Sequence, residues 1–181
     1  QVLFGKTFIT SFTQCLLLII SYGSLIELGR SYSKKFVKRV WGIGLYAFLL
    51  SVVCVGAVFF NVDGAKVFIK YFFGMLGCFW ASRAILLIVK KEKLVSLTSK
   101  YLKNIAFVLM FYGVLLIFSE PLNFFPANII NQDSFTKLVR FPPQLIGALL
   151  ALVMFLFVWQ YYYRYSEEKD FNAVSFNREN K

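Results

Sequence analysis

Long apolar runs separated by short charged segments are the feature that most restricts how this chain can fold. Five stretches of roughly 20 mostly apolar residues follow one another, and most Lys and Arg residues fall between them. Charged residues make up only 16 % of the chain, whereas soluble domains carry about 25 %. Backbone polar groups in lipid must be bonded within their own segment, so each stretch should be a helix. The sequence therefore predicts an all-α integral membrane protein.

The apolar stretches predict a bundle of five transmembrane helices, over about 8–28, 41–62, 67–89, 101–119 and 143–163. The turn dipeptide Asp63-Gly64 is expected to separate the second helix from the third. Lys103 and Asn104 shorten the apolar part of the fourth. On this interpretation residues 1–165 form one transmembrane helical domain and residues 166–181 form a tail.

The distribution of basic residues predicts the orientation. Fourteen of the 20 Lys and Arg residues lie in segments 30–39 and 90–103 and after residue 163, whereas five lie in the segments on the opposite side. Arg83, within the third predicted helix, is the remaining one. Cytoplasmic segments of membrane proteins are enriched in Lys and Arg. The N-terminus is therefore expected outside and the C-terminus in the cytoplasm.

Composition excludes several classes of function. The net charge is +11, and the charged residues flank the apolar runs. This pattern indicates attraction to a lipid bilayer surface and not to nucleic acid. The chain has no histidine, and its three cysteines (Cys15, Cys54 and Cys78) lie inside apolar runs, where they are expected to be buried small side chains. No Walker, GxSxG or HExxH motif occurs. We therefore expect no enzyme activity, no cofactor and no metal site in this chain.

The segment 120–142 is the longest connection on the outer side, and it is too apolar for a disordered linker. Pro126 is expected to open one helical turn, and Asp133 or Ser134 to cap a second one that runs to about Val139. We expect this segment to form either a lid that packs on the bundle or a binding site. Its candidate signal, ligand or coupling residues are Glu120, Phe124, Phe125, Asn128, Asn131 and Arg140.

Two charged residues at helix depth are further candidates for coupling. Arg83 lies about 10 Å inside the inner end of its helix, and Glu27 lies near the inner end of the first. A contact between Glu27 and Arg83 would couple the first and third helices. Alternatively, Arg83 extends to the headgroups and Glu27 pairs with Arg30. Small residues, among them Gly74 with Gly77 and Gly147 with Ala151, predict close helix packing.

Residues 71–165 carry a pattern that resembles a known family. It consists of a glycine followed by a late basic residue (Gly77 to Arg83), a Tyr112-Gly113 helix, a Phe124-Phe125-Pro126-Ala127 loop with Asn131 and Ser134-Phe135, and Pro142-Pro143-Gln144 at the start of the last helix. This pattern is similar to the membrane-embedded N-terminal sensor region of bacterial sensor histidine kinases. Relatives carry more helices upstream, so residues before Gln1 are expected.

The resemblance implies a multi-pass sensory region in the bacterial inner (plasma) membrane. It would act in a two-component system, as a homodimer or within a larger membrane complex, and would pass a signal through its last helix. A kinase module would have to lie downstream of Lys181, because this chain lacks a histidine. Two alternatives remain open: a structural or accessory subunit of a membrane complex, and a small carrier or channel.

Overall fold

The computed structural model describes the backbone of residues 2–32, 39–91 and 96–179, and side chains over 9–32, 43–91 and 97–167. This part of the chain is helical and contains no strand. Its elements are α1 (Val2–Tyr32), α2 (Arg39–Phe68), the π-helical segment η1 (Ile69–Met75), α3 (Leu76–Lys91), α4 (Ser96–Leu115), α5 (Gln132–Val139) and α6 (Pro143–Glu179).

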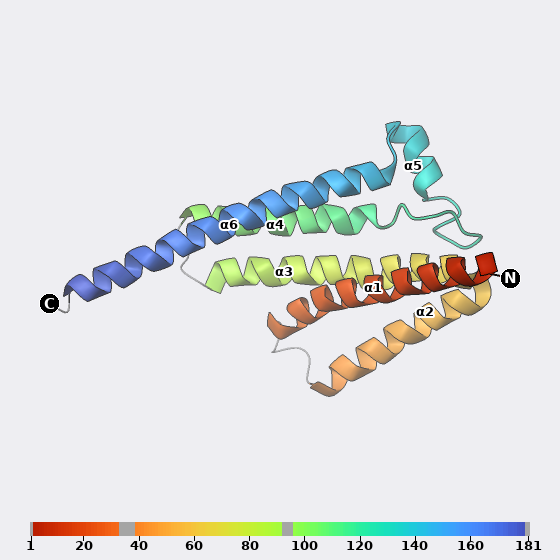
Figure 1. The fold of residues 1–181 in the computed structure, drawn as a ribbon, viewed down its shortest axis with the longest axis horizontal. Coiled ribbons are helices and arrows are strands. Elements are labelled where there is room, and N and C mark those ends of the chain that lie inside the picture. Colours follow the sequence, from red (N-terminus) through yellow and green to blue (C-terminus); the bar gives the residue numbers. More distant parts are fainter. Residues whose placement is uncertain (1, 33–38, 92–95, 180–181) are drawn as a thin grey trace.

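The long helices lie side by side in alternating directions (Figure 1). α1, α3 and α6 run one way, whereas α2 and α4 run the other way. α3 packs between α1 and α4, α6 packs on α4, and α2 packs on α1 and η1. We call the end with the 116–131 segment and α5 the loop end, and the opposite end, where α1 and α3 finish, the tail end. The described chain ends lie at opposite ends of the bundle (Figure 1).

Three stretches of the described chain are long and apolar enough to cross a membrane: Ile9–Tyr32, Ile43–Lys91 and Pro143–Glu167. The second has 49 residues, far more than the roughly 20 that one crossing needs. It folds back on itself as the α2–α3 hairpin (Figure 1). α4 is absent from this set because Lys100, Lys103 and Asn104 interrupt its first turns.

The reversal between α2 and α3 occurs earlier than predicted. Phe60 (φ −130°, ψ 18°) and Asn61 (φ 59°) leave the helical conformation, whereas Asp63 and Gly64 are helical. Asn tolerates positive φ better than most residues because its short polar side chain can bond locally. A β-carbon on Gly64 would collide with Phe60 and with the Gly56 carbonyl oxygen. Asp63 and Gly64 therefore do not form the turn, although the missing side chain of Gly64 lets the chain pack closely after it.

The boundaries of α4 and the end of α6 also differ from the prediction. α4 begins at Ser96 and ends at Leu115, not at 101 and 119. Tertiary hydrogen bonds explain the early end of α4. The carbonyl oxygen of Ile117 accepts a hydrogen bond from the Tyr71 hydroxyl (2.9 Å), and the carbonyl oxygen of Ser119 accepts one from the backbone N–H of Gln132 (2.9 Å). α6 continues beyond Tyr165 to Glu179, so no helix break separates the predicted tail from the bundle.

The core lies where α1, η1, α3 and α4 meet. Ile26, Ile69, Phe73 and Cys78 are fully buried there. Ser82 donates a hydrogen bond of 2.8 Å to the carbonyl oxygen of Ala106, which joins α3 to α4 and satisfies this buried hydroxyl. Cys15 and Cys78 are buried as expected, but Cys54 is exposed on α2, so that expectation was wrong for Cys54.

Glycine sets the spacing of α1 and α3. A β-carbon on Gly77 would lie 2.9 Å from the backbone oxygen of Tyr22, whereas one on Gly44 would meet no atom within 4 Å. We expect Gly77→Ala to lower the free energy of unfolding by about 1–3 kcal/mol through overpacking. Gly44→Ala is the matched control, and should leave the free energy unchanged or raise it by up to about 1 kcal/mol. Unfolding in detergent measures both, and equal effects would contradict close α1–α3 packing at Gly77.

Candidate functional site

The 116–131 segment and α5 form a cover held at the loop end by a capping box. The Asn131 side chain accepts hydrogen bonds from the backbone N–H groups of Asp133 and Ser134, both at 3.0 Å, and the Ser134 hydroxyl accepts from the Asn131 N–H at 3.0 Å. Asn131 is therefore the N-cap of α5, and the predicted caps Asp133 and Ser134 were wrong. The predicted end at Val139 is confirmed. Pro126 opens a single turn as expected, because its carbonyl oxygen accepts from Ile130 N–H at 2.8 Å.

Aromatic contacts fix this cover to the bundle. The Phe124 ring lies 5.3 Å from Phe60 and 5.0 Å from Phe68 of α2, centroid to centroid, which joins the cover to the bundle. Within the cover, the Phe135 ring of α5 lies 4.5 Å from Phe118. Such pairs stabilise by about 0.5–1.5 kcal/mol beyond the area they bury. Other apolar side chains of the cover point outward: Phe125 (75 % exposed), Ile129 (63 %) and Leu138 (84 %). The segment thus both packs on the bundle and presents an apolar outer surface.

The remaining candidates from the sequence do not converge on one place. Glu120 lies 3.9 Å from the Nζ of Lys70 in η1. Asn128 is exposed, and Arg140 is exposed at the end of α5 with φ 62°. Glu27 pairs with Arg30 one turn along α1, with Arg30 Nε donating to a carboxylate oxygen at 2.7 Å. Arg83 is exposed on α3, and within the described part of the chain it makes no ion pair with Glu27.

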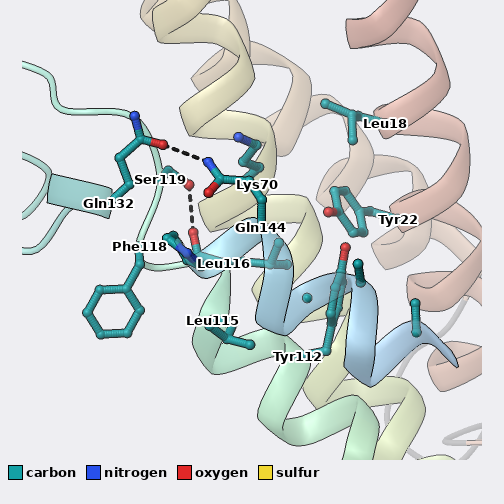
Figure 2. A pocket seen from close by; sticks show the side chains of 14 residues that line it. Leu18, Tyr22, Lys70, Tyr112, Leu115, Leu116, Phe118, Ser119, Gln132 and Gln144 are labelled. Carbon is teal, nitrogen blue, oxygen red and sulfur yellow. Dashed lines mark hydrogen bonds between the residues drawn. The ribbon is translucent and has the colours of Figure 1, made fainter. Parts of the chain in front are cut away.

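A pocket of about 350 Å³ lies beneath the cover, between α1, η1, α4, α5 and α6. Its polar side chains come from Tyr22, Lys70, Tyr112, Ser119, Gln132 and Gln144. Figure 2 shows the hydroxyl ends of Tyr22 and Tyr112 facing each other across it. The first turns of α6 form one wall with the small residues Gly147, Ala148 and Ala151. The volume falls within the range of roughly 300–1,000 Å³ typical of ligand pockets.

Gln132 connects three elements around this pocket. Its backbone N–H donates to Ser119 O at 2.9 Å, and its side-chain oxygen accepts from Gln144 Nε2 at 2.7 Å (Figure 2). The Ser119 hydroxyl donates to Leu116 O at 2.7 Å. The end of α4, the start of α5 and the start of α6 are thereby joined at the mouth of the pocket.

None of the candidate residues chosen from the sequence lines this pocket. Two features of the sequence did point to it, since Tyr112 and Gln144 belong to the pattern of the family resemblance. Lys70 could not be identified from the sequence, because it lies within a continuous apolar run and the direction of its side chain depends on the π-helical segment η1. Lys34, Lys35, Lys38 and Lys93, which supported the predicted orientation, lie outside the described residues.

The pocket offers hydrogen bonds and one cation but no metal site. Over residues 9–32, 43–91 and 97–167 no group of three His, Cys, Asp or Glu side chains could hold a metal ion. Its chemistry is therefore suited to binding a partly apolar molecule with a hydrogen-bonding or anionic group.

Comparison with protein-family models, curated proteins and solved structures finds no significant match for this chain.

The capping box gives a direct test of how the cover is held. Asn131→Ala removes the acceptor of two backbone hydrogen bonds, so we expect the free energy of opening α5 to fall by about 0.5–2 kcal/mol. Hydrogen exchange of the Asp133 and Ser134 amides measures this opening. The matched control is Asn128→Ala, whose side chain is exposed three residues earlier. Equal protection in the two variants would contradict the capping role of Asn131.

Proposed function

We propose that this chain is the membrane-embedded sensory region of a bacterial signalling protein of the histidine-kinase type, and is itself not catalytic. In this proposal α1, α2, α3, α4 and α6 each cross the inner membrane, with the N-terminus outside and the C-terminus in the cytoplasm. The loop end, with its cover and pocket, then faces outward. The sequence resemblance and the excess of Lys and Arg at the tail end support this orientation.

The continuity of α6 is the observation that carries the proposal. Its first turns form a wall of the pocket, and the helix then runs for 37 residues without a break. That corresponds to about 55 Å, well beyond the roughly 30 Å of the hydrocarbon layer. A displacement at the pocket would therefore reach the far side of the membrane within one rigid element.

The packing of α6 suits such a displacement. Of the described helices, α6 contacts only α4 and α5. Gly147 faces Tyr112 of α4 across the pocket, since a β-carbon there would lie 3.7 Å from the Tyr112 ring. A ligand between these helices would change their separation, and helix shifts of about 1–2 Å are a common element of signalling transitions.

A variant that fills the pocket tests this coupling. In Gly147→Leu the added side chain should press against Tyr112 and move α6 away from α4. We expect the distance between spin labels at Lys103 and Arg164, near the tail end, to change by about 1–2 Å or more. In cells the phosphorylation output of the complete gene product should change as well. Leu149→Phe is the control, because Leu149 is exposed on α6 outside the pocket.

Three results would contradict the sensory role. One is an unchanged label distance in Gly147→Leu. Another is a complete gene product that carries no kinase or other output module. The third is purification from native membranes only with fixed partner subunits, which would indicate an accessory subunit of a larger complex instead.

The proposed topology has its own test. A phosphatase fused after Leu138 should be active, because this residue of α5 would lie outside. One fused after Lys91 should be inactive, because the end of α3 would be cytoplasmic. If both fusions were active, the chain between Lys91 and Leu138 would not cross the membrane, and the five-helix arrangement would be overturned.

A further inference from the structure

The pocket beneath the cover is one end of a longer groove. A second cavity of about 460 Å³ lies between α1, α3, α4 and α6. The two cavities share the lining residues Leu18, Tyr22, Tyr112 and Ala151, so they adjoin each other at these side chains, and we call the two together the groove. Within the described chain no Cα atom of α1 lies within 8 Å of a Cα atom of α6. The groove therefore lies between these two helices, above α4.

Polarity changes along the groove. At the loop end its walls carry Lys70, Ser119, Gln132 and Gln144. Toward the tail end most lining side chains are aliphatic, among them Leu25, Ile105, Leu109, Leu150 and Met154, and the hydroxyl groups of Ser21 and Ser24 are the polar additions there. A molecule that matches both parts must have a polar head and an apolar chain.

Lys70 determines the charge of that head. Its side chain is 26 % exposed and forms a long ion pair with Glu120, whose carboxylate oxygen lies 3.9 Å from Nζ. This separation exceeds the hydrogen-bond distance of about 2.7–3.2 Å. With the described residues Lys70 forms no hydrogen bond, so its ammonium group keeps three N–H donors for a ligand. An ammonium group in a half-buried site favours an anionic acceptor, and phosphate oxygens are strong ones.

The length of the groove indicates the chain. Along α6 the lining residues extend from Pro143 to Met154, which corresponds to about 16 Å. The hydrocarbon layer is about 30 Å thick, so the groove has the depth of one leaflet. Its polar end lies at the start of the apolar part of α6, where headgroups would be.

We infer that the groove binds a phospholipid of the outer leaflet, with an acyl chain between α1 and α6 and the phosphate at Lys70. This inference deepens the proposed function by naming the ligand class, and it relies on that proposal only for the orientation and for the consequence of binding. Binding is measured on the purified chain without any signalling readout. The inference and the sensory role can therefore fail separately.

Native mass spectrometry of the purified, detergent-solubilised protein provides the test. Three probes are titrated: dimyristoyl phosphatidylglycerol, dimyristoylglycerol without the phosphate, and glycerol phosphate without the chains. We expect the complete phospholipid to bind at least about tenfold more tightly than either part, because charged hydrogen bonds at Lys70 and burial of the chain both contribute.

Two pairs of variants locate the binding. Lys70→Leu should weaken phospholipid binding about tenfold, whereas Lys66→Leu should not, because Lys66 lies at the same end of the bundle but pairs with Asp63 at 3.2 Å outside the groove. Ala151→Phe should block the groove, and its control is Ala57→Phe on the exposed side of α2. Thermal unfolding verifies that each variant is folded, and the three-probe comparison needs no variant.

Several outcomes would overturn the inference. Equal affinity for glycerol phosphate and for the phospholipid would indicate a simple anion site. Equal affinity for dimyristoylglycerol and for the phospholipid would show that the phosphate, and with it Lys70, does not contribute to binding. Cross-links between two copies at Ala151, together with no phospholipid binding, would show that a second copy of the chain fills the groove.

Discussion

The need to bond every backbone N–H and C=O group within the chain determines most of this structure. Lipid offers no partner for these groups, so the apolar stretches form helices, and over 2–32, 39–91 and 96–179 the non-helical backbone lies at the ends of the bundle. Because lipid is as apolar as leucine, the helices cannot associate through the hydrophobic effect, and close packing replaces it. Gly77 against α1 and the Ser82–Ala106 hydrogen bond between α3 and α4 are the two forms this packing takes.

Hydropathy predicted the features that depend on composition alone. The all-helical class follows directly from the apolar runs, and α1 and α6 cover the stretches expected for them and extend further. The predicted third helix, 67–89, is divided in the structure among the end of α2, η1 and α3, which begins only at Leu76. The position of the α2–α3 reversal could not be predicted in this way. Asn61 and Asp63-Gly64 are all turn-forming residues within four positions; the chain turns at Phe60 and Asn61, and Gly64 packs against Phe60 and Gly56.

The site was harder to predict than the fold, because it depends on how each helix is rotated about its axis. Lys70, Tyr22 and Tyr112 come from three different helical segments and line one pocket only after these have packed. The charged residues within the predicted helices did not identify the site, because Glu27 forms an ion pair with Arg30 on its own helix and Arg83 is exposed. Asn131 was recognised as a candidate, but its role is to hold α5, a local task that a short sequence pattern describes well.

The two bonds of Gln132 have a consequence for the loop between Ser119 and α5. Its backbone amide bonds to Ser119 and its side chain to Gln144, so the ends of residues 119–132 are fixed in space whatever lies between them. Lengthening a closed loop costs little, about 0.6 kcal/mol for each doubling of its length. Insertions within 121–130 would thus leave the spacing of α4 and α6 unchanged, and the chemistry of the outer surface can diversify independently of the helices beneath it.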